Sequence, residues 1–328
     1  MISLQLNPSG MEDEFLKCLN LCFGDWGDRR TYDWYFQRKT AYPDADVMIL
    51  KNDDELVAGS AVTYRKITLP NEAVITVGIM TGSWTLPKFR GQGCFARIIE
   101  ESIRLTAEKK GALVLGFGRR ENSSFRQFAK AGAALFPTTY LFSTPETKLQ
   151  VVASKLKREE SSEPVIKKLF ERQSTSGRGY LRFAYSSMQE FSAQFIHRPF
   201  ETEILSDHYG NFGIVEKKES TNLLQLFLPA SDDEYGIASA LAAFLNYSLE
   251  NGQKLFLYST RADVAQAGKN LGLGVKAGFL PALIADESSL RKALGISEPL
   301  TTKDSSLLAT PGTPWHLNSW NVHSGDRA

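Results

Sequence analysis

The spacing of hydrophobic and polar residues predicts a chain of alternating strands and helices. Two apolar runs, 47–50 and 56–62, flank a short polar run and predict a β-hairpin. A strand over 77–85 leads through a glycine turn into a helix, whose apolar residues recur at helical spacing: Ala96, Ile98, Ile99 and Ile103. A short strand at 111–118 and a short helix at 122–131 are expected to follow. This order of elements indicates an α/β domain.

The residues Arg90-Gly91-Gln92-Gly93-Cys94 join the predicted strand to the predicted helix. The first backbone N–H groups of a helix have no partner inside the helix, and the helix dipole adds positive potential there. Glycine at 91 and 93 lets a bound group approach the backbone without obstruction by a Cβ atom. Lys88 and Arg90 add positive charge beside the turn. The turn is therefore predicted to bind an anion such as a pyrophosphate.

This strand, turn and helix resemble the acyl-CoA-binding motif of the GNAT superfamily of N-acyltransferases, which reads Arg or Gln, two residues, Gly, one residue, Gly or Ala. Arg90 and Gly93 match the motif. Phe95 replaces its last Gly or Ala, as in acetyltransferases of the enhanced-intracellular-survival type. The block from Asn122 to Gly132 is similar to the segment that closes the CoA site in this family. The resemblance implies acetyl-CoA as the acyl donor, no metal, and the following contact residues: Trp84, Thr85, Leu86, Lys88, Arg90, Gly91, Gln92, Gly93, Cys94, Phe95 and Asn122.

The resemblance also implies the reaction, which is transfer of an acetyl group from the thioester to an amine by direct attack in a ternary complex. A backbone N–H on the strand 81–85 would polarise the thioester carbonyl. The tyrosine that serves as the acid in many relatives corresponds to Phe128, which cannot donate a proton. Tyr140 is the predicted substitute, and its alternative role is a core position on the next strand. Glu121 is the candidate base, and its alternative role is a carboxylate favoured by the dipole of the helix that follows.

Two other functions stay open at this point. Phe95 and Phe128 would also suit a protein that binds acyl-CoA as a sensor without turnover. A Fem-type peptidyltransferase would use aminoacyl-tRNA and would not need an intact CoA turn, which the first half of this chain has. The acceptor is expected to be a small-molecule or protein amine, and no cluster of charge in the sequence identifies it.

The second half of the chain resembles a weakened copy of the first. Apolar runs at 212–216 and 222–228 predict a hairpin, followed by a helix at 237–249 and a strand at 254–258. In place of the glycine turn stand three carboxylates, Asp232, Asp233 and Glu234. Each would repel a phosphate charge about 4 Å away by roughly 4 kcal/mol. We therefore expect that this half does not bind CoA.

The predicted fold class is α/β with mixed sheets, in two GNAT-like domains. The catalytic domain is expected at 1–145, a linker with a short helix at 146–178, and a degenerate GNAT-like domain at 179–328. The linker prediction depends on a charged run and a small polar run that flank a helix beginning near Pro164.

Composition argues against several other classes of protein. The 38 Lys and Arg residues nearly balance the 37 Asp and Glu residues, so neither a nucleic acid nor an anionic membrane is indicated as a partner. The cysteines, Cys18, Cys22 and Cys94, have neither disulfide nor metal-site spacing. No apolar run is long enough to span a membrane, and the first residues do not begin a signal peptide. A cytoplasmic protein is expected, and a homo-oligomer is left open.

Residues 313–326 contain two tryptophans and two of the four histidines, an unusual composition for a chain terminus. We expect this segment to dock on the protein. It would either cover the acceptor site of the first domain with His316, His323 or Asp326, or form a strand or cap on the second domain.

Overall fold

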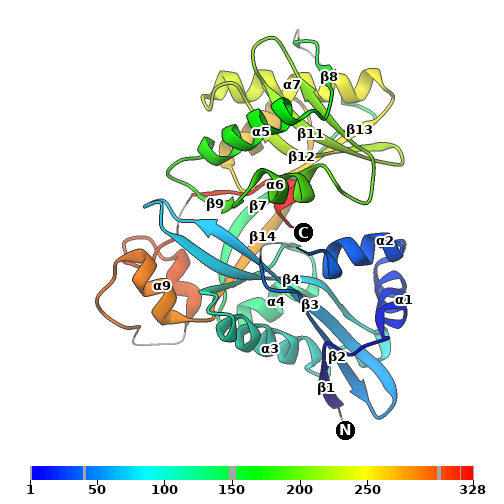
Figure 1. Ribbon diagram of the computed structural model, residues 1–328, viewed down its shortest axis with the longest axis vertical. Coiled ribbons are helices and arrows are strands. Elements are labelled where there is room, and N and C mark those ends of the chain that lie inside the picture. Colours follow the sequence, from blue (N-terminus) through cyan, green and yellow to red (C-terminus); the bar gives the residue numbers. More distant parts are fainter. Residues whose placement is uncertain (1, 40–41, 148–152, 301–303, 318, 328) are drawn as a thin grey trace. The chain divides into compact units, whose positions relative to one another are not determined.

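The computed structural model describes residues 2–39, 42–147, 153–300, 304–317 and 319–327, and its elements are labelled in Figure 1. The chain forms two compact units that are not consecutive in the sequence. Unit 1 contains Met1–Phe136 and Leu280–Asn318, and unit 2 contains Pro137–Phe279 and Ser319–Arg327.

Unit 1 is built on a mixed sheet with the strand order β1-β2-β3-β4-β5-β14. Its neighbours are antiparallel except β4 and β5, which are parallel and are connected by a helix. The elements, in chain order, are β1 (Ile2–Leu6), α1 (Glu12–Phe23), α2 (Arg29–Tyr32), the π-helical turn η1 (Asp33–Gln37), β2 (Asp46–Asn52), β3 (Glu55–Thr68), β4 (Val74–Thr85), the 3-10 turn η2 (Pro87–Phe89), α3 (Cys94–Glu108), β5 (Leu113–Leu115), β6 (Gly118–Arg119), α4 (Ser123–Lys130), β7 (Ala134–Phe142), the end of β14 (Gly274–Ile284), α9 (Glu287–Leu294) and η3 (Ser305–Ala309).

The helices of unit 1 cover both faces of its sheet. On one face, Phe15 of α1 makes edge-to-face contacts with Tyr32, Phe36 and Trp84 at centroid distances of 5.5–5.9 Å. On the other face, α3 buries Ile98, Ile99, Ser102, Leu105 and Thr106, which recur at the spacing of one helix face. The predicted hairpin is confirmed, because β2 and β3 pair from Asn52 and Glu55 outward.

Unit 2 repeats this architecture with the strand order β8-β10-β11-β12-β13-β7. Again the neighbours are antiparallel, apart from the parallel pair β12 and β13, which a helix connects. The elements are β8 (Lys157–Glu159), α5 (Glu163–Thr175), β9 (Leu181–Ala184), α6 (Met188–Phe195), β10 (Thr202–Ser206), β11 (Phe212–Lys218), β12 (Thr221–Leu228), α7 (Glu234–Glu250), β13 (Lys254–Ser259), α8 (Ala262–Asn270), β15 (Trp320–Asn321) and the 3-10 turn η4 (Ser324–Arg327). The hairpin, helix and strand predicted for the second half are confirmed.

Two strands, β7 and β14, each run from one unit into the other, and the sequence did not predict this. The chain leaves unit 1 along β7, whose residues 139–142 pair antiparallel with β13 of unit 2. It returns along β14, whose residues 282–284 pair antiparallel with β5 of unit 1. As a result, Leu280–Asn318 belongs to unit 1, although the sequence placed these residues in the second domain. The predicted linker contributes β8 and α5 to unit 2, and its residues 148–152 lie outside the described residues.

Candidate functional site

The turn after β4 leaves the start of α3 without a cap. After η2, Gly91 and Gly93 have φ values of 82° and 78°, a left-handed conformation that favours glycine. Gly93 is the N-cap residue of α3, and no side chain accepts a hydrogen bond from this helix start. In the described part of the chain, the backbone N–H groups of residues 93–96 form no hydrogen bond with a protein acceptor. These donors and the helix dipole together make a site for an anion.

Space is available at this turn for a bound group. A Cβ atom added to Gly91 or Gly93 would meet no other atom within 4 Å, and both residues are exposed. The buried ring of Phe89 and the buried thiol of Cys94 anchor the two sides of the turn. The backbone of the turn is therefore held from below, while its amides remain accessible.

The two cations beside the turn have partners on the protein. Lys88 forms an exposed ion pair with Glu55 on the β2–β3 hairpin. The Nε of Arg90 donates to the carbonyl oxygen of Thr85 at 3.4 Å. The Sγ of Cys22, near the end of α1, lies 3.6 Å from the same oxygen. Burial raises the pKa of the Cys22 thiol, and the nearby Arg90 guanidinium opposes this rise. Arg90 is thus held over the end of β4, beside the exposed amides.

β4 is irregular just before the turn. Its ladder with β5 ends at Ile79 and Leu115, whereas β4 continues to Thr85. A bulge shifts its register with β3, and Gly82 within it has a φ of 58°. At this position a Cβ atom would lie 2.8 Å from the Phe36 ring, so only glycine fits. Bulges of this kind re-aim the strand and often lie at active sites.

A pair of hydroxyl groups spans the bulge. The Oγ atoms of Ser60 on β3 and Ser83 on β4 are 2.7 Å apart, and Ser60 also lies 3.4 Å from the carbonyl oxygen of Thr81. This pair was not predicted from the sequence, because the partner of Ser83 is fixed by the register of two strands with a bulge. No local pattern could have indicated it.

The two departures from the family motif contact each other. Phe95 in the first turn of α3 and Phe128 on α4 form an edge-to-face pair with centroids 5.6 Å apart. Phe128 is buried, and the tip of its ring lies next to Gly116, where an added Cβ atom would meet it at 3.2 Å. The Phe95 ring thus fills space beside Phe128 that a Gly or Ala would leave empty.

The other predicted site residues lie in three different surroundings. Asn122 precedes α4 as its N-cap residue, and its side chain makes no capping hydrogen bond. Glu121 is exposed and lies 3.6 Å from Arg119 in an ion pair. Tyr140 is buried in unit 2, where its ring contacts Tyr258 and Phe256 on β13. The catalytic roles of Glu121 and Tyr140 stay predictions.

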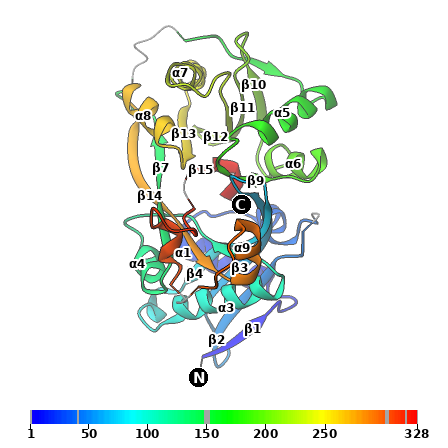
Figure 2. The same cartoon turned by 90° about the vertical axis from the view of Figure 1, so that its left-hand side faces the viewer.

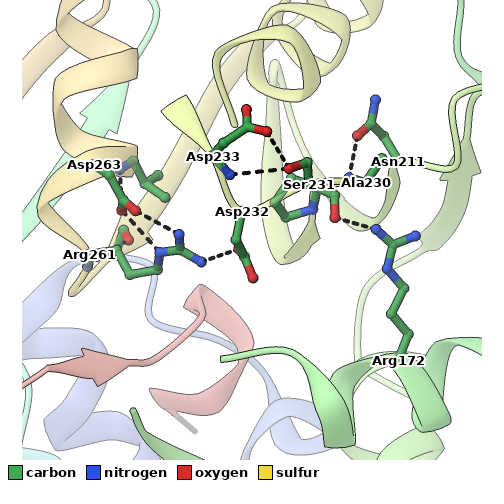
Figure 3. A network of polar contacts seen from close by, with 11 residues as sticks. Arg172, Asn211, Ala230, Ser231, Asp232, Asp233, Arg261 and Asp263 are labelled. Atoms are coloured by element: carbon green, nitrogen blue, oxygen red, sulfur yellow. Dashed lines mark hydrogen bonds and ion pairs between the residues drawn. The ribbon is translucent and has the colours of Figure 1, made fainter. Parts of the chain in front are cut away.

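In unit 2 the corresponding helix start is occupied by the chain itself (Figure 3). Asp233 caps α7, with Oδ1 accepting from the N–H of Gly236 at 2.7 Å and Oδ2 accepting from Ser231 at 2.6 Å. These hydrogen bonds hold the pKa of the Asp233 carboxyl below its usual range. Asp232 pairs with the buried Arg261 at 2.6 Å, and Arg261 also binds Asp263. A carboxylate of the protein thus fills the place that unit 1 leaves to an anion.

The loop before α7 is fixed from its other side as well (Figure 3). Arg172 of α5 donates to the carbonyl oxygens of Gly210 and Pro229. The Oδ1 of Asn211 accepts from the N–H of Ala230 at 2.7 Å. The backbone before α7 is therefore used for internal hydrogen bonds, in contrast to the free amides before α3.

The described residues contain no group of His, Cys, Asp and Glu side chains arranged to hold a metal ion. Within the same residues, every helix is too short or too polar to traverse a bilayer.

Comparison with known proteins identifies the fold. Residues 7–130 match the family described as the acetyltransferase (GNAT) domain. A probable N-acyltransferase from Enterococcus faecalis is similar, with a TM-score of 0.61 and 14% identity over 89% of this chain and 74% of that chain. A tandem GNAT protein from the clavulanic acid biosynthesis pathway has a TM-score of 0.60 and 10% identity, over 87% of this chain and 99% of that one. Eis1 from Mycobacterium abscessus has a TM-score of 0.52 and 11% identity, over 89% and 76%.

No curated protein matches the chain significantly. At these identities the structural likeness concerns the fold, and it confirms the predicted α/β class with two GNAT-like units.

Proposed function

We propose that the GNAT acetyltransferase domain formed by residues 7–130 transfers an acyl group, most simply acetyl, from a CoA thioester to a primary amine. The observation that supports this most directly is the uncapped start of α3, where two left-handed glycines between η2 and α3 leave the backbone amides exposed. The diphosphate of CoA is an anion of the size and charge that such a site binds.

The acyl donor is assigned to the residues around this turn. The amides from Gly91 to Phe95 would hold the diphosphate, with Arg90 and Lys88 at its edge. From there the pantetheine arm would run along the part of β4 that extends beyond its ladder with β5. Thr85 and Leu86 would line its path together with the backbone of Trp84, whose side chain is buried against Phe15. An amide of the strand 81–85 would polarise the thioester carbonyl.

The reaction is direct attack of the amine on the carbonyl carbon. The C–N bond forms, the C–S bond breaks, and the amine loses a proton to a base or to water. Holding both reactants in place supplies much of the rate. An alkylammonium with a pKa near 10.4 is neutral in only about one molecule in a few thousand at pH 7, so proton removal is a large part of the barrier.

We further propose Ser83 as the group that hydrogen-bonds the departing thiolate. Phe128 has no hydroxyl, whereas Ser83 lies on the proposed thioester strand and is oriented by Ser60 at 2.7 Å. A CoA thiol, with a pKa near 8.5, needs only modest stabilisation to leave. A hydrogen bond to a charged group contributes about 1.5–3 kcal/mol, which is enough for this role.

Incubation with acetyl-CoA and a panel of amines, followed by detection of free thiol, tests the proposal. Calorimetry with CoA is run in parallel on the same preparation. Thiol release that depends on one class of amine supports the transferase. CoA binding without release for any amine would identify a sensor, and absence of CoA binding to folded protein would refute the assignment of the turn.

A further inference from the structure

In unit 2, the strands β12 and β13 separate in the same way as β4 and β5. Their parallel ladder covers residues 221–223 and 254–256, after which β12 continues to Leu228 and β13 to Ser259. In unit 1 the ladder also has three pairs before β4 continues alone. The diverging ends of β12 and β13 thus correspond to the position proposed above for the pantetheine arm.

A segment from the end of the chain occupies this position. We call Ser319–Arg327 the tail segment; it belongs to unit 2. The N–H of Tyr258, beyond the ladder on β13, donates to the Oγ of Ser324 at 2.8 Å. The turn η4 packs against both β12 and β13, and it is drawn in red beside β12 in Figure 2.

The tail segment enters as an extended peptide. Its residues 320–321 pair parallel with β9, and the N–H of Leu181 donates to the carbonyl oxygen of Ser319 at 3.0 Å. The hydroxyl of Thr260 donates to the carbonyl oxygen of Trp320 at 2.7 Å and accepts from the N–H of Val322 at 3.0 Å. The main chain of the segment is therefore bound from both sides, as in recognition of a peptide by strand addition.

The side chains of unit 2 also discriminate among residues of the segment. A Cβ atom on Gly325 would lie 2.5 Å from the ring of Phe195 and 3.1 Å from the carbonyl oxygen of Gln225, so only glycine fits. The Asp326 carboxylate accepts from the hydroxyl of Tyr185 and, at 2.8 Å, from the N–H of His323. Asp326 is 1% exposed.

Arg327, the last described residue, lies over two tyrosine rings. The guanidinium of Arg327 lies 4.6 Å from the centre of the Tyr258 ring and 5.4 Å from that of Tyr140. Cations over tyrosine rings at such distances are attracted by the ring quadrupole. Tyr140, predicted from the sequence as a catalytic acid, is thus part of the binding surface for Arg327.

We infer that the diverging ends of β12 and β13 form a peptide-binding site, which this chain fills with its own tail segment. The ligand chemistry that fits is a peptide with an extended stretch, followed by a turn that carries a small residue, an acidic residue and a basic residue. Together with the Asp233 cap on α7, this occupancy explains how a second GNAT-like unit is closed to an acyl donor. The inference concerns unit 2 alone and does not depend on the proposed acyl transfer.

The test cuts the peptide bond that joins the tail segment to the rest of the chain, while the segment is still bound in unit 2. A protease recognition sequence is inserted between Leu317 and Ser319 of the full-length chain, which is then cut under native conditions. A fluorescent peptide with the sequence of residues 319–328 is added, and its uptake is followed by anisotropy. We expect the cut segment to stay with the chain on gel filtration and to exchange with the labelled peptide. The uncut chain should take up none.

Variant peptides test the selectivity. Gly325→Val in the peptide should weaken binding by about one to two powers of ten, because the added carbons have no space. Asp326→Ala should weaken it at least about tenfold, because the hydrogen bond from the buried Tyr185 hydroxyl to the carboxylate would be lost. Ser319→Ala is the matched control, because this side chain is exposed, and should bind like the original peptide.

A second preparation covers the case in which the cut chain loses its structure. The uncut chain with Gly325→Val should expel its own segment and take up the labelled original peptide. The inference is overturned if either folded preparation takes up no peptide, or if all variant peptides bind equally. Loss of the unit 2 structure in both preparations would also overturn it, because the segment would then be part of the core. Thiol release by the same samples reports separately on the proposed transferase.

Discussion

The substitution Gly93→Asp tests the acyl-donor site most directly, because it would place a carboxylate at the N-cap position of α3, where unit 2 has one on α7. Gly93 is the N-cap residue of α3, as Asp233 is of α7. The new side chain would meet no other atom at its Cβ. Its carboxylate could accept from the free amides of the first turn, where it would take the place of the phosphate.

The expected effects on folding and on binding differ strongly. The left-handed φ of 78° costs an aspartate about 1–2 kcal/mol, and a capping hydrogen bond returns about 1 kcal/mol, so stability should change little. A carboxylate about 4 Å from a phosphate charge opposes binding by about 4 kcal/mol near a protein surface. This corresponds to a Kd for CoA that is weaker by about a thousandfold.

Calorimetry with CoA and acetyl-CoA measures the affinity, and circular dichroism with thermal unfolding checks the fold. Gly295→Asp is a matched control, because Gly295 also lies in unit 1, has a φ of 71° and has open space at its Cβ. That variant should bind CoA normally. If folded Gly93→Asp binds CoA within about threefold of the unaltered chain, the diphosphate does not lie at this turn and the reasoning fails.

Three further predictions address separate parts of the structure. Phe128→Ala should destabilise the protein by about 3–5 kcal/mol, because it removes a buried ring; a change of less than about 1 kcal/mol in the free energy of unfolding would contradict the packing described. Ser83→Ala should lower kcat about tenfold or more and leave the Kd for CoA unchanged, with a smaller loss for Ser60→Ala; equal kcat values would exclude the role proposed for Ser83. The Asp233 cap, whose pKa is lowered by its hydrogen bonds, should stabilise α7 fully above the ordinary aspartate pKa of about 3.9 and be lost as the pH falls through the lowered folded value. Asp233→Asn should therefore flatten the acid limb of the stability profile measured by chemical unfolding, and an unchanged limb would argue against it.

Local patterns in the sequence were sufficient for much of the fold. The hairpin of β2 and β3, the turn at Arg90–Gly93 and the elements from β11 to β13 each combine a hydrophobic period with a turn or cap residue. Such patterns report which face of an element is buried, and they do not report its partner. The exchange of β7 and β14 between the units was therefore not predicted, because a returning strand has the same pattern whichever sheet receives it.

The local backbone of the candidate site could be predicted from the sequence, but its tertiary contacts could not. Exposed amides at Gly91 and Gly93 follow from the sequence, because they depend on residues that are neighbours in the chain. The contact of Phe95 with Phe128 and the hydroxyl pair of Ser60 and Ser83 depend on tertiary packing. For residues 313–326 the sequence predicted docking. The structure places His323 and Asp326 in unit 2, where Asp326 accepts from the Tyr185 hydroxyl.

The exchange of β7 and β14 has a consequence for biosynthesis. Leu280–Asn318, which completes unit 1, is translated only after the roughly 140 residues of Pro137–Phe279. At about 5–20 residues per second, the ribosome needs about 7–30 seconds for that stretch. During this interval β5 presents an edge without its eventual neighbour, and such edges are prone to pair with other chains. The nascent amino-terminal part should therefore depend on chaperones or on rapid translation, and cutting the gene between Phe136 and Pro137 would leave the amino-terminal fragment without the β14 residues that pair with β5.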